Sequence, residues 1–73
     1  MEYARLLIEQ ILIRLLVEEK EDKVDLVVDN INGLLETNRG YIEERLDHLI
    51  SNGNSFVVGR EEEIAKRVGR LNI

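Results

Sequence analysis

The first nineteen residues carry apolar side chains on two opposite sides of a predicted helix. One set follows the i, i+3, i+4, i+7 spacing of a helix face that packs on a core. Leu6, Ile13 and Val17 fall almost diametrically opposite that set at about 100° per residue. A helix that is apolar on both sides needs cover on both sides. The core-facing set is Ala4, Leu7, Ile8, Ile11, Leu12, Leu15 and Leu16.

We therefore predict a helix over residues 2–19 and a homodimer whose interface contains Leu6, Ile13 and Val17. A chain of 73 residues has little other material with which to cover the second side. The alternative is a central helix wrapped by the rest of its own chain.

The length predicts a single domain over residues 1–73. The absence of cysteine excludes a disulfide framework, a thiolate metal site and a cysteine nucleophile. The apolar run from Leu6 to Val17 is interrupted by Glu9, Gln10 and Arg14, so it predicts neither a signal segment nor a membrane span. We expect a cytoplasmic protein with no membrane partner.

The net charge of −5 lies in the first half of the chain. Residues 38–73 hold equal numbers of basic and acidic side chains, so residues 1–37 carry the whole acidic excess. This balance disfavours non-specific binding to nucleic acids. If the chain has an anionic partner, we expect the second half to contact it.

A second helix is predicted over residues 22–36, with an apolar inner face and an acidic outer one. The outer acidic stripe consists of Asp22, Asp25, Asp29 and Glu36. Calcium sites generally need 6–8 oxygens gathered by a loop, and no such loop pattern follows, so we predict no metal site. The stripe is either a solvated helix face or a surface that imitates phosphates for a basic partner.

A third helix is predicted over residues 38–52, with Asn38 as its N-cap. Its inner face holds Ile42, Leu46, Leu49 and Ile50, and Asn52–Gly53 is a typical helix end. Phe56–Val57–Val58 follows as a β-prone run.

The stretch Thr37–Val58 resembles the recognition helix and first wing strand of winged helix-turn-helix proteins. The resemblance implies a mainly α fold, with a three-helix helix-turn-helix core in which residues 22–36 form the scaffold helix, and a short C-terminal β-hairpin. It also implies that the outward face of the third helix reads the major groove of double-stranded DNA. The implied DNA contacts on the helix are Asn38, Arg39, Tyr41, Arg45, His48 and Asn52, and the alternative is an ordinary solvent-facing side. The basic cluster of Arg60, Lys66, Arg67 and Arg70 is either a patch that contacts the DNA backbone or the solvated end of a helix.

The C-terminal segment, residues 55–70, has two interpretations. As a helix, Glu61–Glu63 lie at its N-terminal end and Lys66, Arg67 and Arg70 at the other, an order that complements the helix dipole. As a wing, Ser55–Val58 and Ile64–Val68 pair as strands. The local pattern favours the helix, whereas the resemblance requires the hairpin. We favour a short hairpin or an extended contact, with an extra C-terminal helix as the alternative.

No motif for catalysis or cofactor binding is found. His48 is the single histidine, the glycines are isolated, and no carboxylate pair has apolar surroundings that raise a pKa. We therefore expect no enzyme activity and no cofactor. The predicted function is a small homodimeric DNA-binding regulator. The alternative is an acidic protein-interaction module that occludes a basic surface on a larger partner.

Overall fold

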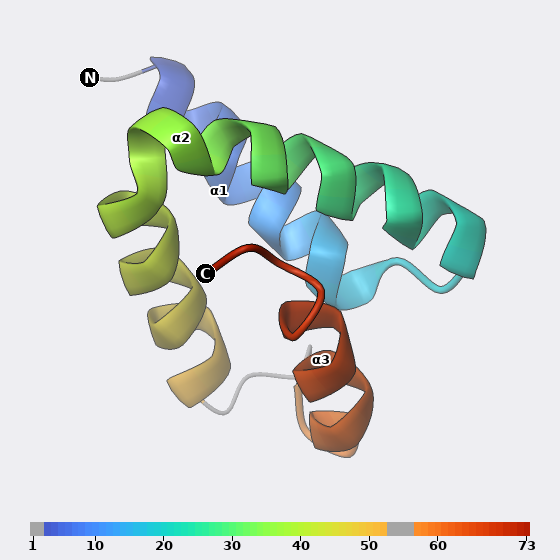
Figure 1. The fold of residues 1–73 in the computed structure, drawn as a ribbon. Helices are drawn as coiled ribbons and strands as arrows, with labels where there is room; N and C mark the ends of the chain where they lie inside the picture. Colours follow the sequence, from blue (N-terminus) through green and yellow to red (C-terminus); the bar gives the residue numbers. More distant parts are fainter. Residues whose placement is uncertain (1–2, 53–56) are drawn as a thin grey trace.

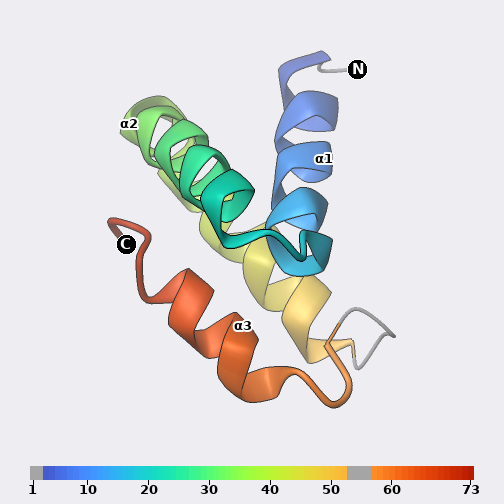
Figure 2. The same cartoon turned by 90° about the vertical axis from the view of Figure 1, so that its right-hand side faces the viewer.

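The described part of the chain folds into three helices: α1 (Tyr3–Val17), α2 (Glu21–Ser51) and α3 (Glu61–Val68). The structure is a computed structural model that describes residues 3–52 and 57–73. Figure 1 shows the first half of α2 crossing over α1, after which the helix bends and descends beside it. The view in Figure 2 shows α3 lying across the lower end of this pair. The mainly α prediction is confirmed.

The core lies between α1 and the two halves of α2. Ile8, Leu12, Leu15 and Leu16 of α1 are buried, as their spacing predicts. Ala4 and Leu7, which we expected on the same face, are exposed instead. The buried side chains of α2 are Val24, Val27, Val28, Ile31, Leu35, Ile42, Leu46 and Leu49.

The two helices expected over residues 22–36 and 38–52 are one element, bent at Asn38. This residue has non-helical backbone angles (φ −130°, ψ 25°) inside α2. Its side-chain amide donates to the carbonyl of Leu34 at 3.3 Å and to the Thr37 hydroxyl at 2.9 Å. Asn38 thus interrupts the backbone ladder and donates back to the first half of the helix, which bends α2 without a loop.

The residues that follow α3 lie on the concave side of this bend, as Figure 1 shows. Leu71 is buried in the core. The backbone N–H of Asn72 donates to Oδ1 of Asn32 at 2.8 Å, and its carbonyl accepts from Arg39 at 2.9 Å. Since Asn32 precedes the bend and Arg39 follows it, one residue joins the two halves of α2.

Of the two interpretations of residues 55–70, the hairpin is wrong for the described residues and the helix is observed, because Glu61–Val68 is helical. Val57–Gly59 form a turn rather than a strand, and Gly59 has a positive φ of 83°. The helix is favoured because acidic residues occupy its first turn and basic ones its last, an order that complements the helix dipole. Ile64 and Arg67 are buried on its inner face. The predicted helix end at Gly53 and the strand residues Ser55 and Phe56 lie outside the described residues.

Candidate functional site

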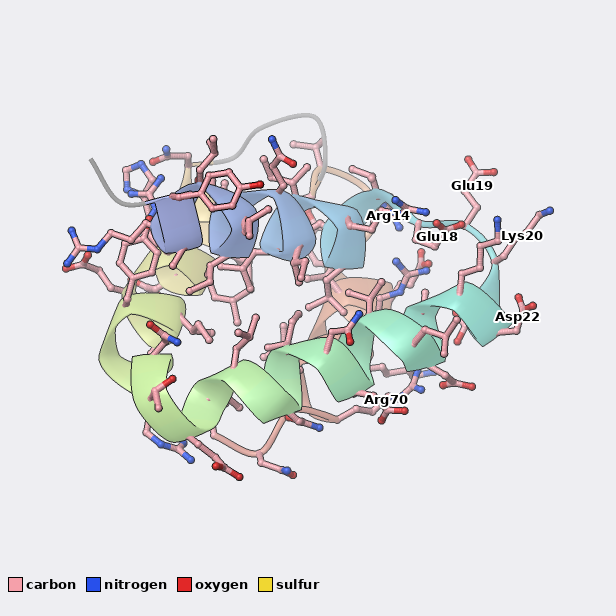
Figure 3. The ribbon with its side chains drawn as sticks, turned by 90° about the horizontal axis from the view of Figure 1, so that it is seen from above. Arg14, Glu18, Glu19, Lys20, Asp22 and Arg70 are labelled. Atoms are coloured by element: carbon pink, nitrogen blue, oxygen red, sulfur yellow. The ribbon has the colours of Figure 1, made fainter. Side chains whose placement is uncertain are left out.

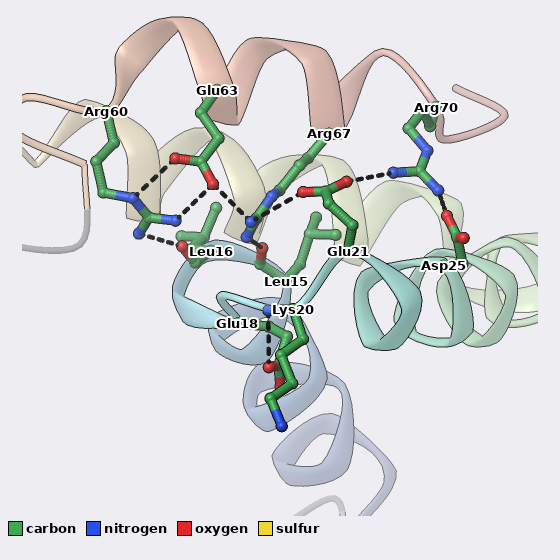
Figure 4. Close-up of polar contacts among 10 residues, drawn as sticks. All are labelled: Leu15, Leu16, Glu18, Lys20, Glu21, Asp25, Arg60, Glu63, Arg67 and Arg70. Carbon is green, nitrogen blue, oxygen red and sulfur yellow. Dashed lines mark hydrogen bonds and ion pairs between the residues drawn. The ribbon is translucent and has the colours of Figure 1, made fainter.

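Two arginines from the C-terminal segment satisfy the last carbonyls of α1. A helix leaves its final C=O groups without partners inside the helix. Nη1 of Arg67 donates to the Leu15 carbonyl at 2.8 Å, and Nη1 of Arg60 donates to the Leu16 carbonyl. Figure 4 shows both contacts side by side. The positive charges also lie at the negative end of the α1 dipole, where they stabilise the helix.

Arg67 is the buried charged side chain of the described core, with 2% of its surface exposed. Its Nη2 contacts Glu63 at 2.6 Å and Glu21 at 3.5 Å. Its Nε is buried and finds no hydrogen-bond partner among the described residues. Through Leu15, Glu63 and Glu21, Arg67 joins all three helices.

The same end of the molecule holds a chain of ion pairs. Arg60 contacts Glu63, and its hydrogen bond lowers the pKa of the Glu63 carboxyl. Arg70 lies between Glu21 and Asp25 of α2, as drawn in Figure 4. Arg60, Arg67 and Arg70 therefore bind carboxylates of their own chain.

Arg45 makes a bidentate ion pair with Glu9, which lies in the middle of α1. Its Nε and Nη2 each lie 2.9 Å from an oxygen of Glu9 on α1. This hydrogen bonding lowers the pKa of Glu9 and raises that of Arg45. Planar two-point pairing holds a guanidinium in a fixed direction. Arg45 thus fastens the second half of α2 to α1.

The other residues implied as DNA contacts are spread over several environments. Tyr41 is half-buried against the core, with the Arg5 guanidinium 5.0 Å from its ring centre. Arg39 contacts Glu43 in addition to the Asn72 carbonyl. His48 and Asn52 are exposed, with His48 Nε2 3.0 Å from Asn52 Nδ2. Asn38 is at the bend, and Lys66 is exposed on α3.

The structure therefore does not assemble the nine implied DNA contacts into one basic surface. Arg45, Arg60 and Arg67 are directed to partners within the chain. Their charges are paired with carboxylates or helix-end carbonyls of the same chain, and Arg67 is also buried, so these three side chains do not form a free cationic surface. The sequence does carry one signal for these arginine contacts. Val17 is followed by charged residues and by no glycine or asparagine that could cap α1, so the last carbonyls of α1 need donors from elsewhere in the chain.

The residues predicted for a dimer interface lie along the outer side of α1. Leu6 is 44% exposed and Val17 is 37% exposed. Ile13 is half-buried and packs against the core of its own chain. The structure contains one chain, so the homodimer stays a prediction.

The acidic stripe lies on the outer face of α2, before the bend. Asp22, Asp29 and Glu36 are exposed, and Asp25 pairs with Arg70. Leu26, 64% exposed, lies beside the stripe at the spacing i+4 from Asp22 and i−3 from Asp29. Figure 3 shows Glu19, Lys20 and Asp22 pointing away from the junction of α1 and α2.

Comparison with known proteins finds no family model, no curated protein and no solved structure that matches this chain. Over residues 3–52 and 57–73, no three His, Cys, Asp or Glu side chains gather in a way that could hold a metal ion. Within the same residues, no helix has the length and apolar character needed to span a bilayer.

Proposed function

We propose that this protein is an acidic protein-interaction module that binds a basic surface of a partner protein through the outer face of α2. The contact face consists of Asp22, Leu26, Asp29 and Glu36. Exposed carboxylates supply the charge that attracts and orients a basic partner. Leu26, 64% exposed beside these carboxylates, supplies an apolar contact next to the charged ones.

The observation that carries the proposal is the internal pairing of the arginines. Arg14, Arg39, Arg45, Arg60, Arg67 and Arg70 all form ion pairs within the chain. The charges left over are mostly negative. Among the described residues, the carboxylates in no ion pair are Glu19, Asp22, Asp29, Glu36, Glu44, Asp47, Glu61 and Glu62, against the cations Arg5, Lys20, Lys23 and Lys66.

The DNA-binding regulator remains the competing hypothesis. Arg39, His48 and Asn52 are accessible along the second half of α2, which supports it. Glu44 and Asp47 are exposed on the same half and repel phosphates. The two hypotheses differ in the sign of the charge that the chain binds, so one titration distinguishes them.

The test measures fluorescence anisotropy of two labelled probes with the full chain. One probe is a lysine-rich amphipathic peptide with leucines on one face, and the other is a random-sequence DNA duplex. We expect the peptide to bind with an affinity that falls as salt rises, and the duplex not to bind even at low salt. Duplex binding without peptide binding would refute the acidic module.

A pair of matched variants locates the binding face. The triple change Asp22→Asn, Asp29→Asn and Glu36→Gln removes three charges from the proposed face. The control triple Glu44→Gln, Asp47→Asn and Glu62→Gln removes three elsewhere. We expect the first triple to weaken peptide binding at least about tenfold and the control to change it much less. An equal loss in both would show that net charge alone attracts the peptide.

A further inference from the structure

The outward side of α1 carries the spacing of a two-stranded coiled-coil seam. Tyr3, Leu6, Gln10, Ile13 and Val17 are separated by three, four, three and four residues. This alternation keeps one stripe of a helix against a second helix. The core-facing residues of α1 lie on the other side, against α2. The seam is thus a second packing surface that the chain itself does not fully cover.

Much of the exposed apolar surface of the described chain is on or beside this seam. Tyr3 is 72% exposed, and Leu6 and Leu7 are 44% and 45% exposed. Val17, at the C-terminal end of the seam, is 37% exposed. Several exposed apolar side chains gathered on one side of a helix indicate a candidate contact surface.

We propose that this seam packs against the same seam of a second copy of the chain, with the two Gln10 side chains facing each other. Gln10 is the middle residue of the five, so pairing in either direction brings Gln10 opposite Gln10. An amide both donates and accepts hydrogen bonds, and two of them satisfy each other. Against a purely apolar partner, the buried amide would lack a partner and would disfavour binding.

The charges beside the seam also fit a second copy. Each chain has a net charge of −5, so two copies repel each other wherever carboxylates are unpaired. Beside the seam, Glu9 is paired with Arg45 and Glu18 with Arg14. The α1 face is therefore close to neutral, whereas the outer face of α2 is acidic. Two identical chains meet with least repulsion through α1.

This inference is independent of the proposed function. A dimer through α1 leaves the outer face of α2 available on both copies, and each copy would present its own acidic surface.

The first test is the mass of the unaltered chain by sedimentation equilibrium. We expect a concentration-dependent mass that approaches twice the 8.5 kDa of one chain. A mass of 8.5 kDa at every concentration would overturn the inference. The test needs no peptide or DNA, so its failure is separate from failure of the proposed function.

The second test compares two polar variants. Leu6→Gln with Val17→Gln removes apolar contacts from the seam without adding charge or changing a buried core residue. Val58→Gln is the control, because Val58 is 64% exposed in the turn before α3. We expect the seam variant to weaken association at least about tenfold and the control to leave it unchanged. Equal association of both variants and the unaltered chain would place the contact elsewhere.

The third test exploits the absence of cysteine from the chain. Gln10→Cys should form a disulfide-linked dimer under mild oxidation, because the two position-10 side chains face each other. Glu44→Cys, exposed on the second half of α2, should remain mostly monomeric. Equal cross-linking of the two variants would indicate random collision and would contradict the seam.

Discussion

Removing the Arg67 side chain tests whether the C-terminal helix is held by its contacts to the end of α1. Arg67→Ala takes the donor away from the Leu15 carbonyl, and a buried group left without a partner costs about 1–3 kcal/mol. It also removes two buried methylenes of the arginine stem, at about 0.8 kcal/mol each. Glu63 and Glu21 are 45% and 70% exposed, so water can replace their ion pairs.

Part of this destabilisation is offset, because the variant no longer buries the Arg67 Nε, whose burial without a hydrogen-bond partner destabilises the native fold. We therefore expect Arg67→Ala to lower the free energy of unfolding by about 2–4 kcal/mol. Arg67→Met keeps an apolar stem of similar length, so its loss should be smaller, about 1–2 kcal/mol.

The assay is urea unfolding followed by far-ultraviolet circular dichroism, with Lys66→Met as the matched control. Lys66 is the exposed neighbour of Arg67 in the same helix, and its change should stay within about 0.5 kcal/mol. A loss below about 1 kcal/mol for Arg67→Ala, equal to that of the control, would refute the reasoning. A lowered denaturant slope would show that α3 detaches before the rest unfolds.

Three further predictions concern the helix interior, acid stability and the bend. Gly33→Ala should stabilise the fold by up to about 1 kcal/mol, since nothing lies within 4 Å of the added Cβ. Gly59→Ala should destabilise it, because Gly59 has a positive φ; the melting temperatures of the two variants test both expectations. The Arg45 hydrogen bond lowers the pKa of Glu9 from its ordinary 4.5, so Glu9 stabilises the fold fully above about pH 4.5 and loses this contribution as the pH falls through its folded-state pKa. Urea midpoints of the unaltered chain and Glu9→Gln should accordingly differ at pH 7 and converge in acid, and a constant difference would contradict the pairing. Asn32→Ala removes the acceptor of the Asn72 N–H and should cost about 0.5–1.5 kcal/mol, with faster amide exchange at residue 72; unchanged exchange would show that this bond does not hold the segment.

Local patterns in the sequence were sufficient for the helices and most of the core. The period of Ile8, Leu12, Leu15 and Leu16 predicts the buried face of α1 because a helix repeats every 3.6 residues. Asn38 was expected at a helix boundary from its capping chemistry, and the structure places the bend of α2 there. The helical order of charges in residues 61–68 was also present locally, and the resemblance to a wing led to the wrong choice.

The partners of the arginines were decided by the tertiary structure. In the sequence, Arg45, Arg60 and Arg67 have the same character as any exposed cation, and a helical stripe with a basic cluster after it resembles a DNA-binding surface. The fold brings Glu9 to Arg45 across 36 residues and the Leu15 carbonyl to Arg67 across 52. A carbonyl at the end of a helix needs a donor, but the sequence does not specify which one will reach it. The helices were therefore predictable from local periodicity, whereas the charge left on the surface depends on pairs that form only when distant segments pack together.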